Sequence, residues 1–179
     1  PALQETDATL GIANPKDVRP GNTALALPSG LAMAAGFDPN MSEQLGEVLG
    51  REAAARGFNV LLGPGINLTR EPRGGRNFEY FGEDPLLAGT LAGAMITGIQ
   101  SQHVIATAKH FALNDQESGR DIMDVRLPEN QARESDLLAF EIALARGRPG
   151  AVMCAYNKVG GIYACGNRQL LTQTLKEDW

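Results

Sequence analysis

Short apolar runs of strand length recur along the chain, separated by longer stretches with helical spacing. Residues 58–62, 104–111 and 151–156 are largely apolar, and the first run is closed by Gly-Pro-Gly at 63–65. Near-continuous apolar runs are typical of strands buried on both faces of a parallel sheet. A further short run at 24–27 is interpreted as the end of another strand.

Four segments between these runs are predicted to be helices: 39–56, 85 to about 101, 129–146, and 168 to about 177. Each of the first two follows an Asp-Pro pair, which supplies an N-cap and then a proline at the first helical position. The third ends at Gly147, a helix-stop signal, and Asn167 is expected to cap the fourth. Strands that alternate with helices predict an α/β fold with a parallel sheet.

Polar clusters distinguish between the two common parallel folds. They follow successive strands at 67–79, 109–120 and 156–157. In a β/α barrel all three would meet at one rim, whereas an open doubly wound sheet gathers ligand-binding residues only at its switch point. We therefore predict an incomplete (β/α)8 TIM-barrel-like domain made of several βα units.

Composition argues against two classes of partner. The net charge of −5 and the pI near 5.1 leave no basic face for phosphates, so nucleic acid is not expected. No run of about eighteen apolar residues occurs, so no membrane span is expected. The first residues also lack the pattern of a signal peptide.

Neither a metal nor a cofactor is expected. The chain has two histidines, and its two cysteines do not form a C-x-x-C motif, which disfavours a zinc or iron site. The glycine-rich pieces at 63–65 and 74–75 match neither a dinucleotide fingerprint nor a P-loop. Cys154 and Cys165 permit one disulfide, but we interpret them as a buried small residue and a loop thiol.

Three motifs together resemble glycoside hydrolase family 3, of the β-glucosidase and β-xylosidase type. They are RGGRNFE at 73–79 with GEDP at 82–85, AKHF at 108–111, and MCAYNKVGG at 153–161. The resemblance extends from about Leu3 to Trp179. It implies that residues 1–179 are part of a single N-terminal barrel domain, and that a C-terminal α/β sandwich domain lies outside this chain.

The resemblance also implies a sugar site. Its residues would be Asp7, Arg76, Lys109 and His110, with Met153 and Tyr156 beside them. These residue types suit a polyol, because a carboxylate accepts from hydroxyl groups, a cation donates to them, and charge-assisted hydrogen bonds are the strong ones. The neighbouring ammonium of Lys109 is expected to lower the pKa of His110 and keep it neutral.

The family likeness implies an exo-acting β-glycosidase that releases terminal non-reducing β-D-glucosyl residues by a retaining, two-carboxylate mechanism. Asp178 is rejected as the nucleophile because it lies on a predicted helix, so no catalytic residue is expected in this chain. The nucleophile is expected shortly after Trp179, and the acid/base in the sandwich domain. The N-acetylglucosaminidase branch is disfavoured because no histidine follows Lys109-His110-Phe111 in the loop.

The expected partners are a β-glucoside or oligosaccharide and the remainder of the enzyme, in a periplasmic or secreted location. These 179 residues alone are expected to be inactive. Two other functions remain open: a non-catalytic sugar-binding module, and an unrelated barrel enzyme such as a phosphate-ester lyase with Lys109 as base. Arg73 is interpreted as a structural ion-pair residue, and Phe37 and Trp179 as core residues.

Overall fold

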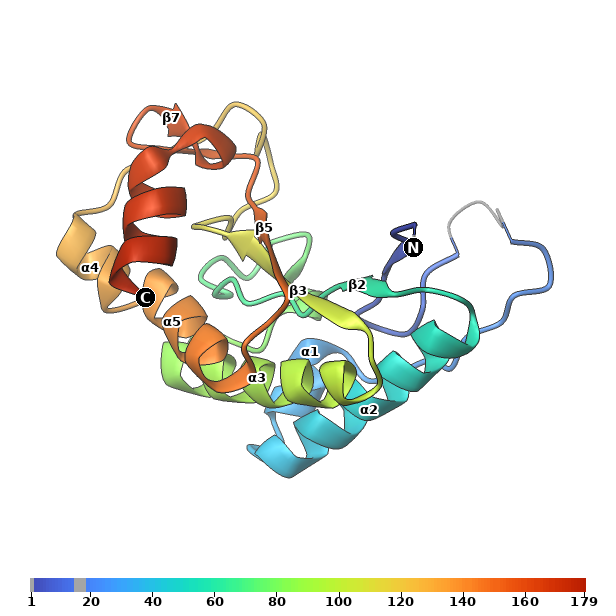
Figure 1. Cartoon of the computed structure of the whole chain (residues 1–179). Coiled ribbons are helices and arrows are strands. Elements are labelled where there is room, and N and C mark those ends of the chain that lie inside the picture. Colours follow the sequence, from blue (N-terminus) through green and yellow to red (C-terminus); the bar gives the residue numbers. More distant parts are fainter. Residues whose placement is uncertain (1, 15–18) are drawn as a thin grey trace.

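A computed structural model describes residues 2–14 and 19–179 of the chain (Figure 1). Within these ranges, the main sheet has four parallel strands in the order β1 (Glu5–Asp7), β2 (Val60–Leu62), β3 (Ile105–Phe111) and β5 (Ala151–Cys154). Each strand pairs with the next one of this sheet along the chain. The sheet therefore grows in one direction, as a barrel wall does.

The helices that connect these strands cover one side of the sheet. They are α2 (Pro39–Ala55), α3 (Pro85–Ser101) and α5 (Asp136–Gly147), with α2 packed on α3 and α3 on α5 (Figure 1). A doubly wound sheet would carry helices on both faces, whereas a barrel carries them only outside. The predicted incomplete (β/α)8 barrel is confirmed.

Local sequence explains where the long helices begin. Asp38 accepts a hydrogen bond from the Asn40 amide at 2.9 Å, and Asp84 accepts one from the Leu87 amide at 2.7 Å. α2 and α3 then pack closely against each other at Gly98 of α3. A side chain at Gly98 would collide with the backbone of α2, so the two helices can approach only because this position carries no Cβ.

The predicted helix at 129–146 is wrong in one respect, because it is two helices. α4 (Glu129–Arg133) and α5 are separated at Ser135, whose φ of −134° and ψ of −98° are not helical. The Ser135 hydroxyl lies 2.7 Å from the Gln131 carbonyl oxygen and 2.8 Å from Asp136 Oδ2, and its single proton can be donated to either acceptor. Such local bonds compete with the helical ladder and explain the break.

Several short elements were not predicted. They are β1, α1 (Gly30–Ala34), η2 (Asn77–Glu79), η3 (Ala164–Gly166), and a small sheet of β4 (Asp124–Val125), β6 (Lys158–Val159) and β7 (Ile162–Tyr163). The apolar run at 24–27 is not a strand. The last helix, η4 (Gln169–Asp178), has π-helical spacing and begins after Asn167, whose Oδ1 accepts from the Leu170 amide at 3.2 Å.

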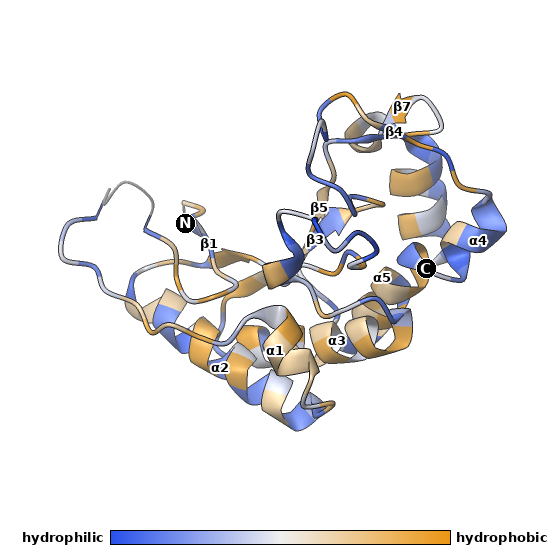
Figure 2. Ribbon diagram, turned by 180° about the vertical axis from the view of Figure 1, so that it is seen from behind, coloured by the Kyte–Doolittle hydropathy of each residue, from blue (hydrophilic) through white to orange (hydrophobic). Residues whose placement is uncertain are grey.

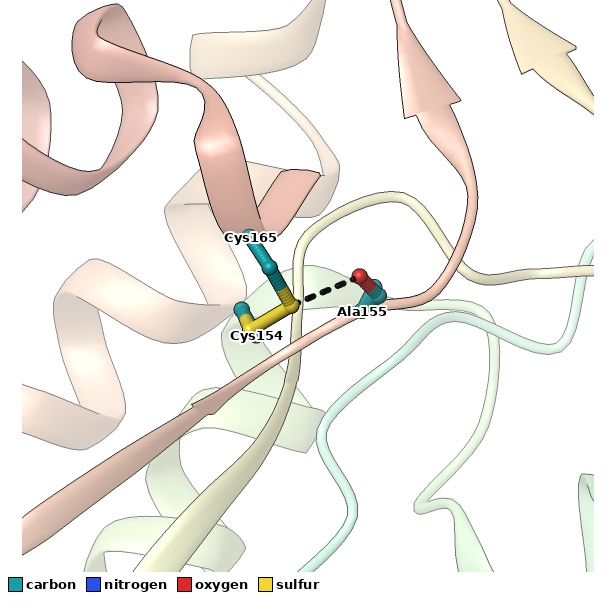
Figure 3. Close-up of a disulfide and its surroundings, with 3 residues drawn as sticks. All are labelled: Cys154, Ala155 and Cys165. Carbon is teal, nitrogen blue, oxygen red and sulfur yellow. Dashed lines mark hydrogen bonds between the residues drawn. A yellow bond between two sulfur atoms is a disulfide. The ribbon is translucent and has the colours of Figure 1, made fainter. Parts of the chain in front are cut away.

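The cysteines form a disulfide, so their interpretation as unbonded residues was wrong. Cys154 ends β5 and Cys165 lies in η3, with their Cα atoms 5.1 Å apart (Figure 3). The sulfur of Cys165 also lies 3.3 Å from the carbonyl oxygen of Ala155. The disulfide closes the loop that contains β6 and β7.

The hydrophobic core lies between the sheet and its helices. Figure 2 shows that β2 and the first part of β3 are apolar, whereas the carboxyl end of β3 and the loops beside it are hydrophilic. Trp179 packs against Phe111 as expected, with ring centroids 5.9 Å apart. Phe37 is 72% exposed, so its assignment to the core was wrong. No helix in the described ranges is long and apolar enough to cross a membrane.

Candidate ligand-binding site

A cavity of about 290 Å³ opens where β1 and β3 end. Its charged lining residues are Asp7, Arg76, Glu79 and Lys109, and the segment 8–13 supplies much of the rest. The volume is at the lower end of the range for small-molecule sites. Asp7 and Lys109 lie at or near the carboxyl ends of β1 and β3, where parallel α/β folds bind ligands.

Three larger cavities differ in character, and one of them, of about 390 Å³, lies between Phe37 and the start of α3. Another, of about 510 Å³, lies between α4, η4 and the small sheet, and the third, of about 830 Å³, lies beside β5 and η4. Their ionisable lining residues are all exposed, whereas Lys109 and Glu79 are buried. Functional sites often contain buried charged side chains held by specific partners, so the smaller cavity is the better candidate for a ligand-binding site.

Lys109 is at the centre of the charged network. Its Nζ lies 3.0 Å from Asp7 Oδ1 and 3.3 Å from Glu79 Oε2. Glu79 also accepts from the Thr9 hydroxyl at 3.2 Å and from Nε of Arg76. Asp7 remains 63% exposed, so it can accept hydrogen bonds from a ligand while it contacts Lys109.

His110 is held next to this network by backbone and side-chain bonds. Its amide donates to Asn67 Oδ1 at 2.8 Å, and its carbonyl accepts from Asn67 Nδ2 at 3.0 Å. Its Nδ1 lies 3.4 Å from the hydroxyl of Tyr80 and 3.4 Å from Asn67 Oδ1. The imidazole is therefore fixed in orientation as well as buried.

The pKa of His110 is lowered to about 2, first by burial and then by the positive charges of Arg76, Lys109 and Arg120. The predicted direction is thus correct, but burial is the main cause and Lys109 only one of three cations. The imidazole is neutral at physiological pH, so one ring nitrogen donates a hydrogen bond and the other accepts one.

The structure separates the predicted site residues into two groups. Asp7, Arg76 and Lys109 line one cavity, and His110 is buried beside Lys109. Met153, which pairs in register with Lys109, is half-buried outside the lining of that cavity. Tyr156 also lies outside it and is 58% exposed.

Sequence reasoning missed the role of Arg120. Its guanidinium carbon lies 4.8 Å from the centroid of the Tyr156 ring, and its Nη1 lies 2.9 Å from Glu117 Oε2. Asn114 donates to the other oxygen of Glu117 at 2.9 Å. Arg120 thus links the loop after β3 to the loop after β5, a contact that no local spacing predicts.

The two arginines of the RGGRNFE motif have different surroundings. Arg73 pairs with Glu71 at 2.8 Å and is 89% exposed, which fits its interpretation as a structural ion-pair residue. Arg76 pairs with Glu79 and also lines the cavity. Glu79 was not predicted as a site residue, although its i,i+3 spacing from Arg76 was a usable signal for their ion pair.

The residues that line this cavity do not form a metal-binding site. Among residues 2–14 and 19–179, no group of three or more His, Cys, Asp or Glu side chains is arranged to hold a metal ion. The carboxylates at the cavity instead contact cations of the protein itself. The arrangement offers neighbouring hydrogen-bond donors and acceptors, which is the requirement of a polyol.

Comparison with known proteins gives a consistent assignment. Residues 1–179 match the model of the glycosyl hydrolase family 3 N terminal domain. The chain is 42% identical to thermostable beta-glucosidase B of Acetivibrio thermocellus and 40% identical to probable beta-glucosidase H of Aspergillus flavus, with all of this chain covered in both alignments. It spans 24% and 21% of those proteins.

Solved structures agree. Beta-glucosidase 3B of Thermotoga neapolitana in complex with alpha-D-glucose superimposes with a TM-score of 0.95 at 40% identity, over 100% of this chain and 26% of that one. The Kluyveromyces marxianus beta-glucosidase in complex with glucose gives 0.96 at 36% identity, over 100% of this chain and 22% of that one. The chain therefore belongs to glycosyl hydrolase family 3, within its N-terminal domain.

Proposed function

We propose that this chain forms the sugar-binding part of a β-glucosidase that releases terminal non-reducing β-D-glucosyl residues. The observation that carries the proposal is the cavity in which Asp7, Arg76 and Lys109 meet, anchored by buried Glu79. Two of the similar solved structures are complexes with glucose, which supports a pyranose as the ligand.

Each side chain has a distinct part in this proposal. Asp7 accepts hydrogen bonds from sugar hydroxyl groups, because its carboxylate is largely exposed. Lys109 and Arg76 donate to hydroxyl groups while Glu79 holds both of them in place. Neutral His110 contributes to binding without adding charge beside the two cations. Fixed, charge-assisted contacts of this kind orient the sugar for reaction.

The chemical step requires groups that we place beyond Trp179. A retaining glycosidase uses one carboxylate as nucleophile and a second carboxyl group as acid/base. Glu79 is buried and bonded to three donors, and Asp7 contacts Lys109, so neither is free for these roles. Asp178 is paired with Arg133 at 2.6 Å, away from the cavity lining. We infer a nucleophile shortly after Trp179 and an acid/base in a following α/β sandwich domain.

The lyase alternative is disfavoured by the contacts of Lys109. A general-base lysine must present a free amine to its substrate. Here Nζ is engaged by two carboxylates within 3.3 Å, which makes it a positioned hydrogen-bond donor. A glycoside-binding role uses Lys109 in this form.

Hydrolysis assays test the proposal. The 179-residue chain alone is expected to show no turnover of p-nitrophenyl β-glucoside, whereas the protein that continues through the sandwich domain hydrolyses it. In that longer protein Lys109→Met should lower kcat/KM by about 10- to 100-fold, because each hydrogen bond to a charged group is worth about 1.5–3 kcal/mol. The matched control is Lys158→Met, since Lys158 stacks on Tyr163 in the small sheet.

Two results would overturn the proposal. One is turnover by the 179-residue chain well above a blank without enzyme. The other is a longer protein that binds glucose but hydrolyses no β-glucoside, which would make it a sugar-binding protein of the same fold.

We also propose a location outside the cytoplasm. The Cys154–Cys165 disulfide supports it, because disulfides persist mainly in oxidising compartments. Labelling of free thiols in protein taken directly from cells tests this, and two reactive cysteines would contradict it.

A further inference from the structure

The segment that follows Asp7 forms one wall of the sugar cavity. Most of residues 8–13, here called the β1 loop, line that cavity. The Ala13 amide donates to the Asp7 carbonyl at 2.8 Å, so the loop leaves β1 and returns to the end of the same strand. Its outer side is held through the backbone, because the Leu27 amide donates to the Leu10 carbonyl at 3.0 Å.

Thr9 carries the only polar side chain of the β1 loop, whose other residues are Ala, Leu, Gly and Ile. Its hydroxyl donates to Glu79 Oε2 at 3.2 Å, across a sequence separation of 70 residues. Glu79 is 3% exposed, so water has little access to its carboxylate and does not easily replace the hydroxyl. This bond therefore joins the cavity wall to the buried acid that holds the two cations of the site.

The oxygen that accepts from Thr9 also faces Lys109. Nζ of Lys109 lies 3.3 Å from Glu79 Oε2 and donates to Asp7 Oδ1 at 3.0 Å. Arg76 pairs with the other oxygen of Glu79. An ammonium group carries three protons, so contacts with two carboxylates leave Lys109 one donor for a ligand while it stays between them.

Loss of the Thr9 hydroxyl would disturb this arrangement. A buried carboxylate oxygen that loses a donor is costly, and Lys109 is the cation left beside Oε2 among the described residues. The ammonium would be drawn toward Glu79 and away from Asp7, which is 63% exposed and can take donors from water instead. The donor available to a ligand would move with it.

We propose that Thr9 is a positioning residue, which holds Lys109 in place for sugar binding through its hydrogen bond to Glu79. Thr9 acts through the carboxylate, so it does not itself need to touch the sugar. The proposal rests on the proposed function, because it concerns binding at the same site. None of the three sequence motifs contains residue 9, and its role arises from a bond across the cavity.

Thr9→Val tests the proposal in the protein that continues through the sandwich domain. Valine has nearly the shape of threonine but cannot donate a hydrogen bond. We expect the KM for p-nitrophenyl β-glucoside to rise about tenfold and kcat to change by less than about threefold, because a misplaced binding group weakens substrate binding. Thr9→Ser keeps the hydroxyl and should stay within about threefold of the wild-type KM.

A double-mutant cycle shows whether Thr9 acts through Lys109. In protein that already carries Lys109→Met, Thr9→Val should change KM by less than about twofold, because the group it positions is absent. A direct contact between Thr9 and the sugar would instead give the same factor in both backgrounds. Thr97→Val is the matched control and should leave KM unchanged, since Thr97 is an exposed residue of α3 whose hydroxyl donates to the Gly93 carbonyl at 3.1 Å.

All variants are compared at a temperature where circular dichroism shows them fully folded, so a role in stability alone predicts unchanged KM values. Three results would overturn the proposal: a wild-type KM in Thr9→Val, an equal rise in Thr9→Ser and Thr9→Val, or the same factor with and without Lys109. Where Thr9→Val does not fold, Thr9→Ala takes its place in the same comparisons.

Failure of the proposed function is recognised separately, because the longer wild-type protein would then hydrolyse no β-glucoside. Thr9 is in that case judged by glucose binding, measured by calorimetry on the wild type and Thr9→Val. A dissociation constant about tenfold higher in the variant supports the positioning role, and equal constants refute it. A wild-type protein that neither hydrolyses a β-glucoside nor binds glucose refutes both proposals.

Discussion

Replacement of Glu79 by glutamine tests how the charged cavity is held together. Glu79 is 3% exposed and bonds Thr9, Arg76 and Lys109, and glutamine keeps its shape while removing its charge. Arg76 and buried Lys109 would then lie close together without the carboxylate between them. Removing one partner of a buried ion pair costs about 3–5 kcal/mol, because the remaining charge is uncompensated.

Asp7 reduces this cost, since it still contacts Lys109 at 3.0 Å. We therefore expect a loss of about 3 kcal/mol in the free energy of unfolding. For a domain of this size that corresponds to a fall of about 6–12 °C in Tm. The assay is thermal unfolding of the 179-residue chain followed by circular dichroism, with glucose titration by calorimetry on the folded variant.

Glu71→Gln is the matched control. Glu71 lies in the same loop and makes an ion pair with Arg73 at 2.8 Å, but that arginine is 89% exposed. Exposed pairs contribute little, so this variant should melt at the wild-type temperature. The reasoning would be refuted by a Glu79→Gln protein that melts within about 2 °C of both wild type and Glu71→Gln.

Two further predictions concern titration and the disulfide. The pKa of His110, lowered to about 2, means that the folded state resists a proton that the unfolded chain accepts near pH 6.5. Protonation of the unfolded chain therefore leaves the free energy of unfolding unchanged above about pH 6.5 and lowers it by about 3 kcal/mol at pH 4.5. In the folded protein, the NMR resonances of the His110 ring should show no inflection between pH 4 and pH 8. An inflection near pH 6.5 would contradict the burial argument. Reduction of the Cys154–Cys165 disulfide, which spans a sequence separation of 11, should cost about 3 kcal/mol and lower the Tm, as measured with and without dithiothreitol. Cys154→Ser should melt at the temperature of the reduced protein and be insensitive to the reductant.

The long helices could be predicted from sequence because their signals are local. The ends of α2 and α3 follow from Asp-Pro caps, and the observed bounds differ from the predicted ones by at most one residue. The strand β3 is also identified by its apolar run. In each case the residues that determine the element lie inside it or directly beside it.

Elements that depend on distant partners could not be predicted. β1 has three residues and exists through its parallel pairing with β2, more than fifty residues away. The small sheet is built from two-residue strands that have no periodicity of their own. The break before α5 comes from the hydroxyl of Ser135, and the disulfide depends on loop geometry that spacing alone does not give.

The candidate site shows the same division. Lys109 was identified from its position at the end of an apolar strand, but Asp7 entered only through the family resemblance. The ion pair between them spans 102 positions in the sequence. Arg120 was not assigned a role because its significance arises from contacts between loops.

The charge balance of the cavity favours a neutral ligand. Lys109 and Arg76 carry two positive charges, and Glu79 and Asp7 carry two negative ones, so these four lining groups sum to zero. A site for a phosphate or carboxylate needs a surplus of positive charge, which this cavity lacks. Neutral His110 adds none. A polyol instead requires donors and acceptors next to each other, and the pairing of Lys109 with exposed Asp7 supplies both within 3.0 Å.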